Sequence, residues 1–307
     1  MRTAMWPATK AAWYDRRGKL LGPVGAPGAV WEPSISQDER SLAFGRTTGS
    51  RTDLWLRNFA RGVEQRFTNN PSSNWLPVWS PQGDRIAFSS NRVNRILNLY
   101  QRSASGIGQD ELLLATANNK VPTQWSHDGD FVVYTEIDPK TKGNIWVLPM
   151  QGTAGRKPVP FLQSESDEIL GQLSPDSHWM AYTSDETGQR EVYVRPFPAG
   201  EGQWKISTEG GEQPRWRGDG KELFFVGADG KMMAVAVKGI AGAQHSFEHG
   251  TPQPLFDAHL AQVPGDWWFE YDVTADGRRF LLNTMRGGPL SAPVLNVVVN
   301  WDAGLKK

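Results

Sequence analysis

Short apolar runs alternate with polar turns along the whole chain, and one arrangement recurs six times. In each repeat a four-residue polar turn separates two apolar runs. The turns comprise residues 36–39, 80–83, 126–129, 174–177, 217–220 and 274–277. Their first residues follow one another at intervals of 44, 46, 48, 43 and 57 residues. A period in the forties with several short strands per repeat is typical of the four-stranded blades of a β-propeller.

The residue types in these turns fit a tight connection between antiparallel strands. Ser or Thr at the first position can bond a nearby backbone N–H, Pro presets φ at the second position, and Gly accepts a positive φ at the fourth. The segment 80–83 shows all three features. The runs that follow the turns, such as 86–88 and 132–134, are apolar throughout. This pattern predicts second strands that are buried on both faces between neighbouring blades.

Two further elements keep step with the turns. Third strands, in which polar and apolar positions mix, are predicted at 53–56, 98–101, 144–147, 191–194, 231–234 and 296–299. Outer strands are predicted at 65–68, 111–114, 158–161, 203–206 and 254–256. The run 158–161 contains two prolines, which a sheet tolerates only at its edge.

The two ends of the chain are predicted to share one blade. Residues 12–21 look like a third strand, a turn and an outer strand, and residues 271–301 supply the first three strands of a blade. An N-terminal strand that completes this last blade would close the ring. We therefore predict an all-β protein, a single propeller domain over 1–307 with six four-stranded blades. A surplus strand around Trp13 leaves seven blades or a truncated ring as the alternative. The predicted blades span about 31–70, 74–117, 120–164, 167–209 and 212–260, and 12–30 together with 266–301.

Composition limits the classes of partner. Lys and Arg total 33 and Asp and Glu total 33, so the formal net charge is zero and neither nucleic acid nor a membrane surface is expected as a partner. Cysteine is absent, which excludes disulfides and thiolate chemistry. The sequence contains no apolar stretch typical of an export signal or membrane span, so a soluble chain is expected. The sequence is compatible with either the cytoplasm or the periplasm. A closed ring needs no partner for its sheet edges, which favours a monomer.

The repeats resemble those of TolB-type propellers, a group of PD40 or WD40-like repeats. The resemblance rests on the Ser-Pro-Asp-Gly-like turns, the Ile-Ala-Phe-like second runs and the Ser-Asn-Arg at 90–92. Segments 13–19, 193–198 and 300–307 are similar to the C-terminal propellers of bacterial, especially acidobacterial, serine/threonine protein kinases. The resemblance covers about 12–307. It implies a propeller fold and a sensor or scaffold role, since one propeller serves many functions.

Catalytic motifs that accompany such propellers in larger proteins do not occur in this sequence. There is no Gly-rich loop followed by Val-Ala-Ile-Lys, no His-Arg-Asp and no Asp-Phe-Gly, so the chain is not itself a kinase. No Gly-x-Ser-x-Gly indicates a hydrolase domain. We therefore expect a protein without catalytic residues, metal or cofactor.

Two groups of polar residues could suggest metal binding. His245 and His249 are four residues apart, but they lie in a stretch predicted to be a surface loop, and two ligands make a weak site. The turn aspartates, such as Asp128 and Asp176, recur with the fold, and bonding to backbone N–H groups within the turn explains them. Neither group is expected to hold an ion.

The candidate binding residues break the repeat on the face opposite the turns. Strand alternation places the connections between blades on that face, and loops carry function more often than the scaffold does. Trp and Arg are favoured at binding hot spots, although each Trp could equally seal the channel mouth or a blade junction. The candidates are Glu32, Trp75, Asn91, Arg92, Asp185, Glu186, Arg215, Trp267 and Trp268.

Three classes of function follow from the sequence. The favoured one is a non-catalytic module that binds a protein, peptide or small ligand on the loop face. The second is a hydrolase or lactonase with a metal at the channel mouth, for which the first strands offer few suitable ligands apart from Glu32. The third is an envelope scaffold like TolB.

Overall fold

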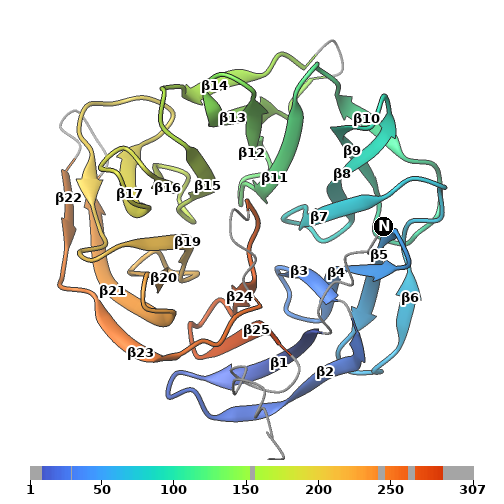
Figure 1. Ribbon diagram of the computed structural model, residues 1–307, viewed down its shortest axis with the longest axis horizontal. Helices are drawn as coiled ribbons and strands as arrows, with labels where there is room; N and C mark the ends of the chain where they lie inside the picture. Colours follow the sequence, from blue (N-terminus) through green and yellow to red (C-terminus); the bar gives the residue numbers. More distant parts are fainter. Residues whose placement is uncertain (1–8, 29, 153–155, 241–245, 262–266, 286–307) are drawn as a thin grey trace, which may run out of the picture.

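Six antiparallel β-sheets are arranged as blades around a central channel in the computed structural model (Figure 1). The structure describes residues 9–28, 30–152, 156–240, 246–261 and 267–285. Within these ranges every regular element is a strand, and no helix is available to cross a membrane. The all-β, six-bladed propeller predicted from the repeats is confirmed.

Five blades are each formed by one continuous stretch of chain, in the strand order of the sequence. The first blade consists of β3 (Val30–Ile35), β4 (Ser41–Thr48), β5 (Arg51–Asn58) and β6 (Glu64–Arg66). The second consists of β7 (Asn74–Trp79), β8 (Arg85–Val93), β9 (Ile96–Ser103) and β10 (Glu111–Leu114). The third consists of β11 (Asn119–Trp125), β12 (Phe131–Asp138), β13 (Lys142–Pro149) and β14 (Val159–Leu162). The fourth consists of β15 (Glu168–Leu173), β16 (Trp179–Ser184), β17 (Glu191–Pro196) and β18 (Trp204–Lys205). The fifth consists of β19 (Gly211–Trp216), β20 (Glu222–Gly227), β21 (Lys231–Ile240), β22 (Ser246–His249) and β23 (Gln253–Asp257).

The sixth blade joins the two ends of the chain. Its inner strands are β24 (Tyr271–Val273) and β25 (Arg279–Met285), followed outward by β1 (Thr9–Asp15) and β2 (Leu20–Gly28). β1 pairs with β25 along its whole length, from Thr9 opposite Met285 to Asp15 opposite Arg279. The strand around Trp13 is therefore not surplus but the third strand of the closing blade. The third strand predicted at 296–299 lies outside the described residues, and β1 occupies that position instead.

The fifth blade departs from the four-stranded pattern. β21 pairs with β23 as the expected outer strand, and its C-terminal half pairs with β22. The surface loop predicted around His249 is wrong for residues 246–249, because Phe247 of β22 is buried against Trp179 of the preceding blade, with ring centroids 5.1 Å apart. His245 lies outside the described residues.

The six turns share one hydrogen-bond pattern. In each, the N–H of the fourth residue donates to the carbonyl of the first at 2.8–3.0 Å, and the fourth residue has a positive φ. Four of these residues are glycines, such as Gly83 and Gly129, and the others are Glu39 and Ser177. The turn aspartates bond within the turn as predicted: Oδ1 of Asp128 accepts from Asp130 N at 2.9 Å.

Five first strands carry a bulge, and in four of them the bulge includes a residue other than glycine with a positive φ. Glu32, Leu76, Leu170 and Gln213, each four residues before its turn, have φ of 55–60°. The pairing register with the second strand shifts across each of these residues. A bulge turns the following side chains relative to the regular alternation of a strand. These bulges therefore set which side chains face the channel.

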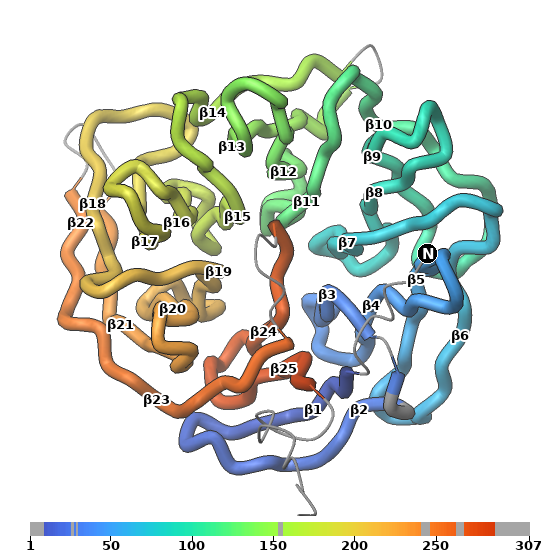
Figure 2. The backbone as a smooth tube through the Cα atoms, viewed as in Figure 1, coloured from blue at the N-terminus to red at the C-terminus, as the bar shows by residue number. Residues whose placement is uncertain are grey.

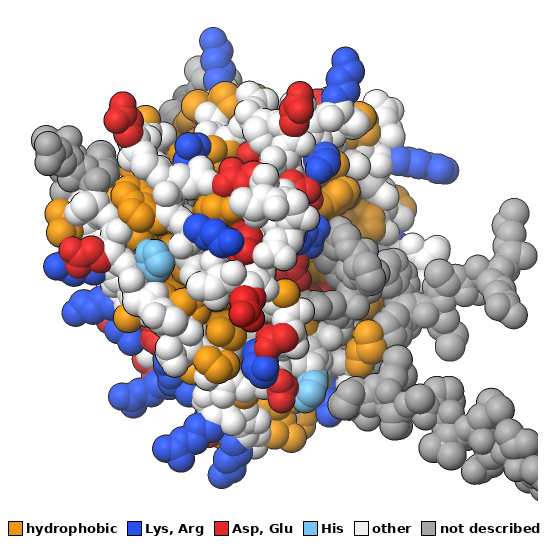
Figure 3. Space-filling model, turned by 60° about the vertical axis from the view of Figure 1, so that its left-hand side comes forward, with side chains coloured by type: hydrophobic (Ala, Val, Ile, Leu, Met, Phe, Trp, Pro, Cys, Tyr) orange, Lys and Arg blue, Asp and Glu red, His pale blue; other side chains and the backbone are white. Residues whose placement is uncertain are grey.

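The hydrophobic core is divided between neighbouring blades rather than gathered at one centre. One cluster, for example, joins Val133 and Ile145 of one blade to Met180 and Tyr182 of the next. On the outer surface, Lys and Arg are interspersed with Asp and Glu on the face seen in Figure 3. The segment that leads into β24 crosses the central channel (Figures 1 and 2).

Candidate functional site

The central channel holds a cavity at each of its two mouths. We call the face with the six turns the turn face and the opposite one the loop face. The turn-face cavity has a volume of about 140 Å³ and the loop-face cavity about 360 Å³. The two cavities differ in chemistry, because different positions of the first strands line them.

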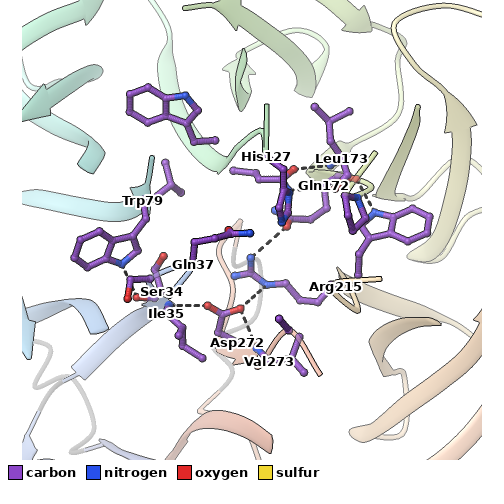
Figure 4. A pocket seen from close by; sticks show the side chains of 18 of the residues that line it. Ser34, Ile35, Gln37, Trp79, His127, Gln172, Leu173, Arg215, Asp272 and Val273 are labelled. Atoms are coloured by element: carbon purple, nitrogen blue, oxygen red, sulfur yellow. Dashed lines mark hydrogen bonds and ion pairs between the residues drawn. The ribbon is translucent and has the colours of Figure 1, made fainter. Parts of the chain in front are cut away.

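The turn-face cavity is lined by the residue two positions before each turn. In ring order these are Ser34, Val78, Gln124, Gln172, Arg215 and Asp272. Figure 4 shows the guanidinium of Arg215 between Gln172 and Asp272. Arg215 donates to Gln172 Oε1 at 3.2 Å, and its Nε lies 3.7 Å from Asp272 Oδ1. Its Cζ lies 3.7 Å from the centroid of the Phe269 ring.

Three of these side chains bond to the backbone of a neighbouring blade. Gln124 Nε2 donates to Leu173 O at 3.1 Å, and Gln172 Nε2 donates to Thr123 O at 2.6 Å. Asp272 Oδ2 accepts from Ile35 N at 2.7 Å (Figure 4). Because these bonds connect first strands of successive blades, the polar ring stabilises the closed propeller.

Electrostatics at this mouth fit a structural role. Burial raises the pKa of Asp272, while Arg215 and the N–H groups of Ile35 and Val273 oppose that rise. Burial also lowers the pKa of His127, against the opposing charge of Asp128. The guanidinium of Arg215 therefore interacts with the carboxyl group of Asp272 within the lining.

The loop-face cavity is lined mainly by aromatic and aliphatic side chains. Its lining includes the four tryptophans Trp31, Trp75, Trp267 and Trp268, together with Glu32. The remaining lining residues are Thr47, Ser50, Thr52, Leu76, Leu97, Asn119, Val121 and Ile137. An apolar cavity with few polar groups is the usual form of a ligand-binding site.

Two local structures position this lining. The segment entering β24 brings Trp267 and Trp268 into the channel mouth, where Trp268 Nε1 donates to Glu270 Oε1 at 2.8 Å. Glu270 is fully buried, and Gln213 Oε1 accepts its N–H at 2.8 Å. On the other side, the left-handed backbone at Glu32 turns its carboxylate toward the next blade, where Oε2 accepts the N–H of Leu76. The indole of Trp268 and the carboxylate of Glu32 are therefore held by hydrogen bonds to buried groups.

Four of the nine predicted binding residues meet at this cavity: Glu32, Trp75, Trp267 and Trp268. The predicted loop-face position of Arg215 is wrong, because this residue lines the turn-face cavity. Arg215 stands two residues before the turn at 217–220, near the turn end of β19, and the side chains at this position in the other blades line the same cavity.

The other four candidates make contacts within or between blades and do not line the loop-face cavity. Asn91 Oδ1 accepts from Ser73 N at 3.1 Å. Arg92 Nη1 lies 2.7 Å from Asp110 Oδ2 in an ion pair, and Arg92 Cζ lies 4.0 Å from the centroid of the Tyr100 ring.

Asp185 and Glu186 belong to the same group of four. Asp185 pairs with Lys142 at 2.9 Å and accepts from Asp167 N at 2.7 Å. Glu186 accepts a hydrogen bond from Gln203. These contacts give each side chain a role in holding strands and connections together.

The prediction missed several lining residues. Leu97, Val121 and Ile137 are ordinary apolar strand positions, and Asn119 is a strand start. Nothing in their local sequence distinguishes them from core residues. Trp31 carried a signal, since it stands directly before Glu32 at the position that Trp75 holds one blade later.

The described residues contain no group of three or more His, Asp or Glu side chains arranged to hold a metal ion. Among the described residues that line the loop-face cavity, Glu32 is the single acidic one. The arrangement of these residues suits binding through apolar contact.

Comparison with known proteins supports the fold. No family model matches the sequence. The putative TolB from Agrobacterium tumefaciens is similar in structure with a TM-score of 0.66 and 16% identity, over 91% of this chain and 99% of that one. TolB from Acinetobacter baumannii gives 0.61 and 13%, over 92% of this chain and 65% of that one. An oligogalacturonate lyase from Vibrio parahaemolyticus gives 0.57 and 12%, over 90% and 91%. The chain thus has a TolB-like β-propeller fold, which it shares with proteins of different function.

Proposed function

We propose that this protein is a non-catalytic binding module whose ligand enters the loop-face cavity. The observation that carries the proposal is the gathering of Trp31, Trp75, Trp267 and Trp268 around about 360 Å³ at the channel mouth. These residues come from three separate first-strand regions, so the folded ring is needed to bring them together. Indole rings supply large contact areas at low entropic cost, which favours binding energy concentrated here.

The contrast between the two mouths supports this choice. At the turn face the polar groups bond to neighbouring blades, as Gln124 and Asp272 do. At the loop face, Trp75, Trp267 and Trp268 remain only half-buried, which leaves indole surface available for contact. Half-buried aromatic rings around a cavity are typical of a recognition surface.

A sensory or scaffolding role is the wider part of this proposal. It is supported by the resemblance of segments 13–19, 193–198 and 300–307 to the propellers of bacterial serine/threonine kinases. The similarity in fold to TolB is compatible with a scaffold role as well. No observation on the described residues favours the hydrolase alternative over a sensory or a scaffold role. Reading the gene upstream of the Met1 codon for a kinase domain in the same frame tests the sensory role.

The binding proposal can be tested with small apolar fragments, for example indole, benzyl alcohol and cyclohexanol, followed by tryptophan fluorescence. We expect saturable binding that Trp268→Ala and Trp75→Ala each weaken by about tenfold or more, since hot-spot truncations cost about 2 kcal/mol. Gln37→Ala is the matched control, because Gln37 is exposed and lines the turn-face cavity. Binding that depends on Gln37 and not on either Trp would overturn the proposal.

A further inference from the structure

We propose that the turn-face cavity is a second binding site, which takes a small carboxylate through the guanidinium of Arg215. This inference goes beyond the proposed function, because it concerns the other mouth of the channel and a ligand of different chemistry. Three observations carry it: the hydrogen-bond donors that Arg215 and His127 have left over, the acceptors that structural contacts already use, and the size of the cavity.

Arg215 keeps most of its hydrogen-bond donors available. Its side chain is 15% exposed, and among the described residues only Gln172 accepts a hydrogen bond from it, from Nη1. Nε is buried and has no hydrogen-bond partner in the described part of the chain. Asp272 Oδ1, at 3.7 Å, is close enough for an ion pair but too far for a hydrogen bond. The planar fork of a guanidinium matches the two oxygens of a carboxylate.

Two further side chains bring polar groups from other blades to the same cavity. His127, in the turn of the third blade, lines the cavity, and its buried Nδ1 has no hydrogen-bond partner among the described residues. A neutral imidazole can donate from one of its two nitrogens. Gln37, in the turn of the first blade, points into the channel mouth toward Arg215 (Figure 4). Three blades therefore contribute possible donors to one cavity.

The acidic groups of the lining are already engaged by the protein itself. Asp272 Oδ2 accepts the N–H of Ile35 at 2.7 Å, and its Oδ1 accepts the N–H of Val273 at 2.9 Å. Glu39 is the other acidic residue of the described lining, and its Oε2 lies 3.0 Å from Nη2 of Arg279. The unused hydrogen-bonding capacity at this mouth is thus mainly that of donors. A carboxylate, which only accepts, complements it.

The size of the cavity limits the ligand to a small acid. Its volume of about 140 Å³ is similar to that of an apolar cavity of roughly 150 Å³ that holds one benzene molecule. Propionate fits within this limit. Water also fits, but hydrogen bonds between a guanidinium and a carboxylate are about twice as strong as those between neutral groups. A small carboxylate therefore gains more from Arg215 than water does.

Propionate and propionamide test this inference, because they have nearly the same shape and differ in charge. Each is titrated into the full chain at constant ionic strength, and the side-chain NMR signals of the five histidines are followed. We expect propionate to shift the signal of His127 saturably, and to bind about tenfold or more tightly than propionamide. A His127→Gln variant assigns the signal. Propionamide binding as tightly as propionate would overturn the inference.

Two variants locate the binding. Arg215→Gln removes the charge and the fork, so propionate should bind about tenfold or more weakly, and a melting temperature shows whether the variant is folded. Gln37→Glu serves if it is not, because Gln37 is exposed and the new carboxylate at this mouth repels propionate without affecting propionamide. Gln82→Glu is the matched control, since Gln82 is an exposed turn residue outside the lining.

Three further results would also overturn the inference. One is a folded Arg215→Gln variant that binds propionate as the wild type does. Another is a Gln37→Glu variant that binds propionate as tightly as Gln82→Glu does. The last is a His127 signal that stays in place up to about 100 mM propionate, a concentration at which even weak binding of a small ligand is measurable. The cavity would then hold water only, and the proposed function of the loop-face cavity would be unaffected.

Discussion

Asp272 Oδ2 accepts a hydrogen bond from the backbone N–H of Ile35 at 2.7 Å, and this contact joins first strands that are 237 residues apart in the chain. Asp272 lies two residues before its turn and Ile35 lies one residue before the turn of the next blade. Gln124 Oε1 makes the same contact with Leu173 N at 2.5 Å. The repetition indicates that this position ties adjacent blades together around the channel.

Replacing Asp272 should therefore loosen the ring at its closure. We expect Asp272→Ala to lower the free energy of unfolding by roughly 2–4 kcal/mol, because two backbone N–H groups lose their acceptor and half-buried Arg215 loses its counter-charge. Urea unfolding monitored by tryptophan fluorescence measures the change. Asp229→Ala, at an exposed hairpin, should cost less than about 0.5 kcal/mol. Equal effects of the two substitutions would argue against the closure role.

A second prediction concerns the packing of β21 and its partner strand β22 on the preceding blade. A Cβ atom at Gly239 would lie 2.2 Å from Nε1 of Trp179, whereas at Gly250 the nearest atom would be 3.8 Å away. Gly239→Ala should destabilise the protein by about 1–3 kcal/mol through overpacking. Gly250→Ala, three residues after Phe247, should leave the urea midpoint nearly unchanged. If both variants unfold at the wild-type midpoint, the contact between Gly239 and Trp179 is not close-packed.

Closure by the N-terminal strands makes a third prediction. A chain that starts at Val30 lacks β1 and β2, and the edge of β25, with buried Phe280 and Leu282, would be left unpaired. An uncovered apolar edge promotes association. We expect this chain to aggregate on size-exclusion chromatography, and a peptide of residues 9–28 to restore monomer during refolding. A stable monomer with the melting temperature of the full chain would contradict the assignment of β1.

The pH dependence of stability should report on Lys120. This side chain is fully buried, donates to Asn98 Oδ1 at 3.1 Å, and has a pKa lowered to about 8 by burial, against the opposing charge of Glu136. Between the folded pKa of about 8 and the unfolded value of 10.5, the unfolded chain holds more protons. Stability should therefore rise with pH across that window, by at most about 1.4 kcal/mol per pH unit.

Urea unfolding at several pH values from 7.5 to 9.5 measures this dependence, and Lys120→Met provides the comparison. The variant should lack the contribution of Lys120 and show a flatter profile. Above pH 10 the raised pKa of buried Tyr134 acts in the opposite direction, because the unfolded chain then releases protons first. Identical slopes for wild type and variant below pH 10 would show that Lys120 does not titrate in this range.

The repeats could be predicted because their determinants are local. Each turn is specified by a few residues, and the positive φ at Gly83 or Gly129 is the conformation that glycine makes accessible without strain. The apolar second runs then follow from burial on both faces. These features depend only on neighbouring residues within each repeat. The all-β six-bladed architecture could therefore be predicted from the sequence.

The closing blade could not be fully predicted, because two apolar segments compete for one position. Residues 12–15 and 296–299 both have the pattern of a third strand, and the period of the repeats does not choose between them. In the structure β1 pairs with β25. β22 was also missed, because the burial of Phe247 against Trp179 depends on the neighbouring blade and not on local pattern.

The candidate site was predictable only in part for a similar reason. Glu32 and Trp75 lie on the predicted face, whereas Arg215, two residues before its turn, lies at the opposite end of the channel. Trp267 and Trp268 reach the cavity because the segment before β24 crosses the channel, which no local pattern specifies.

The most direct test of the loop-face site is a fluorine NMR titration of protein labelled with 5-fluorotryptophan, using benzyl alcohol as the ligand. The chain has 14 tryptophans, and single Trp→Phe variants assign the signals. The account predicts that the signals of Trp31, Trp75, Trp267 and Trp268 shift together with one affinity, while those of Trp79 and Trp216 at the turn-face cavity stay in place. Shifts confined to Trp79 and Trp216 would contradict it.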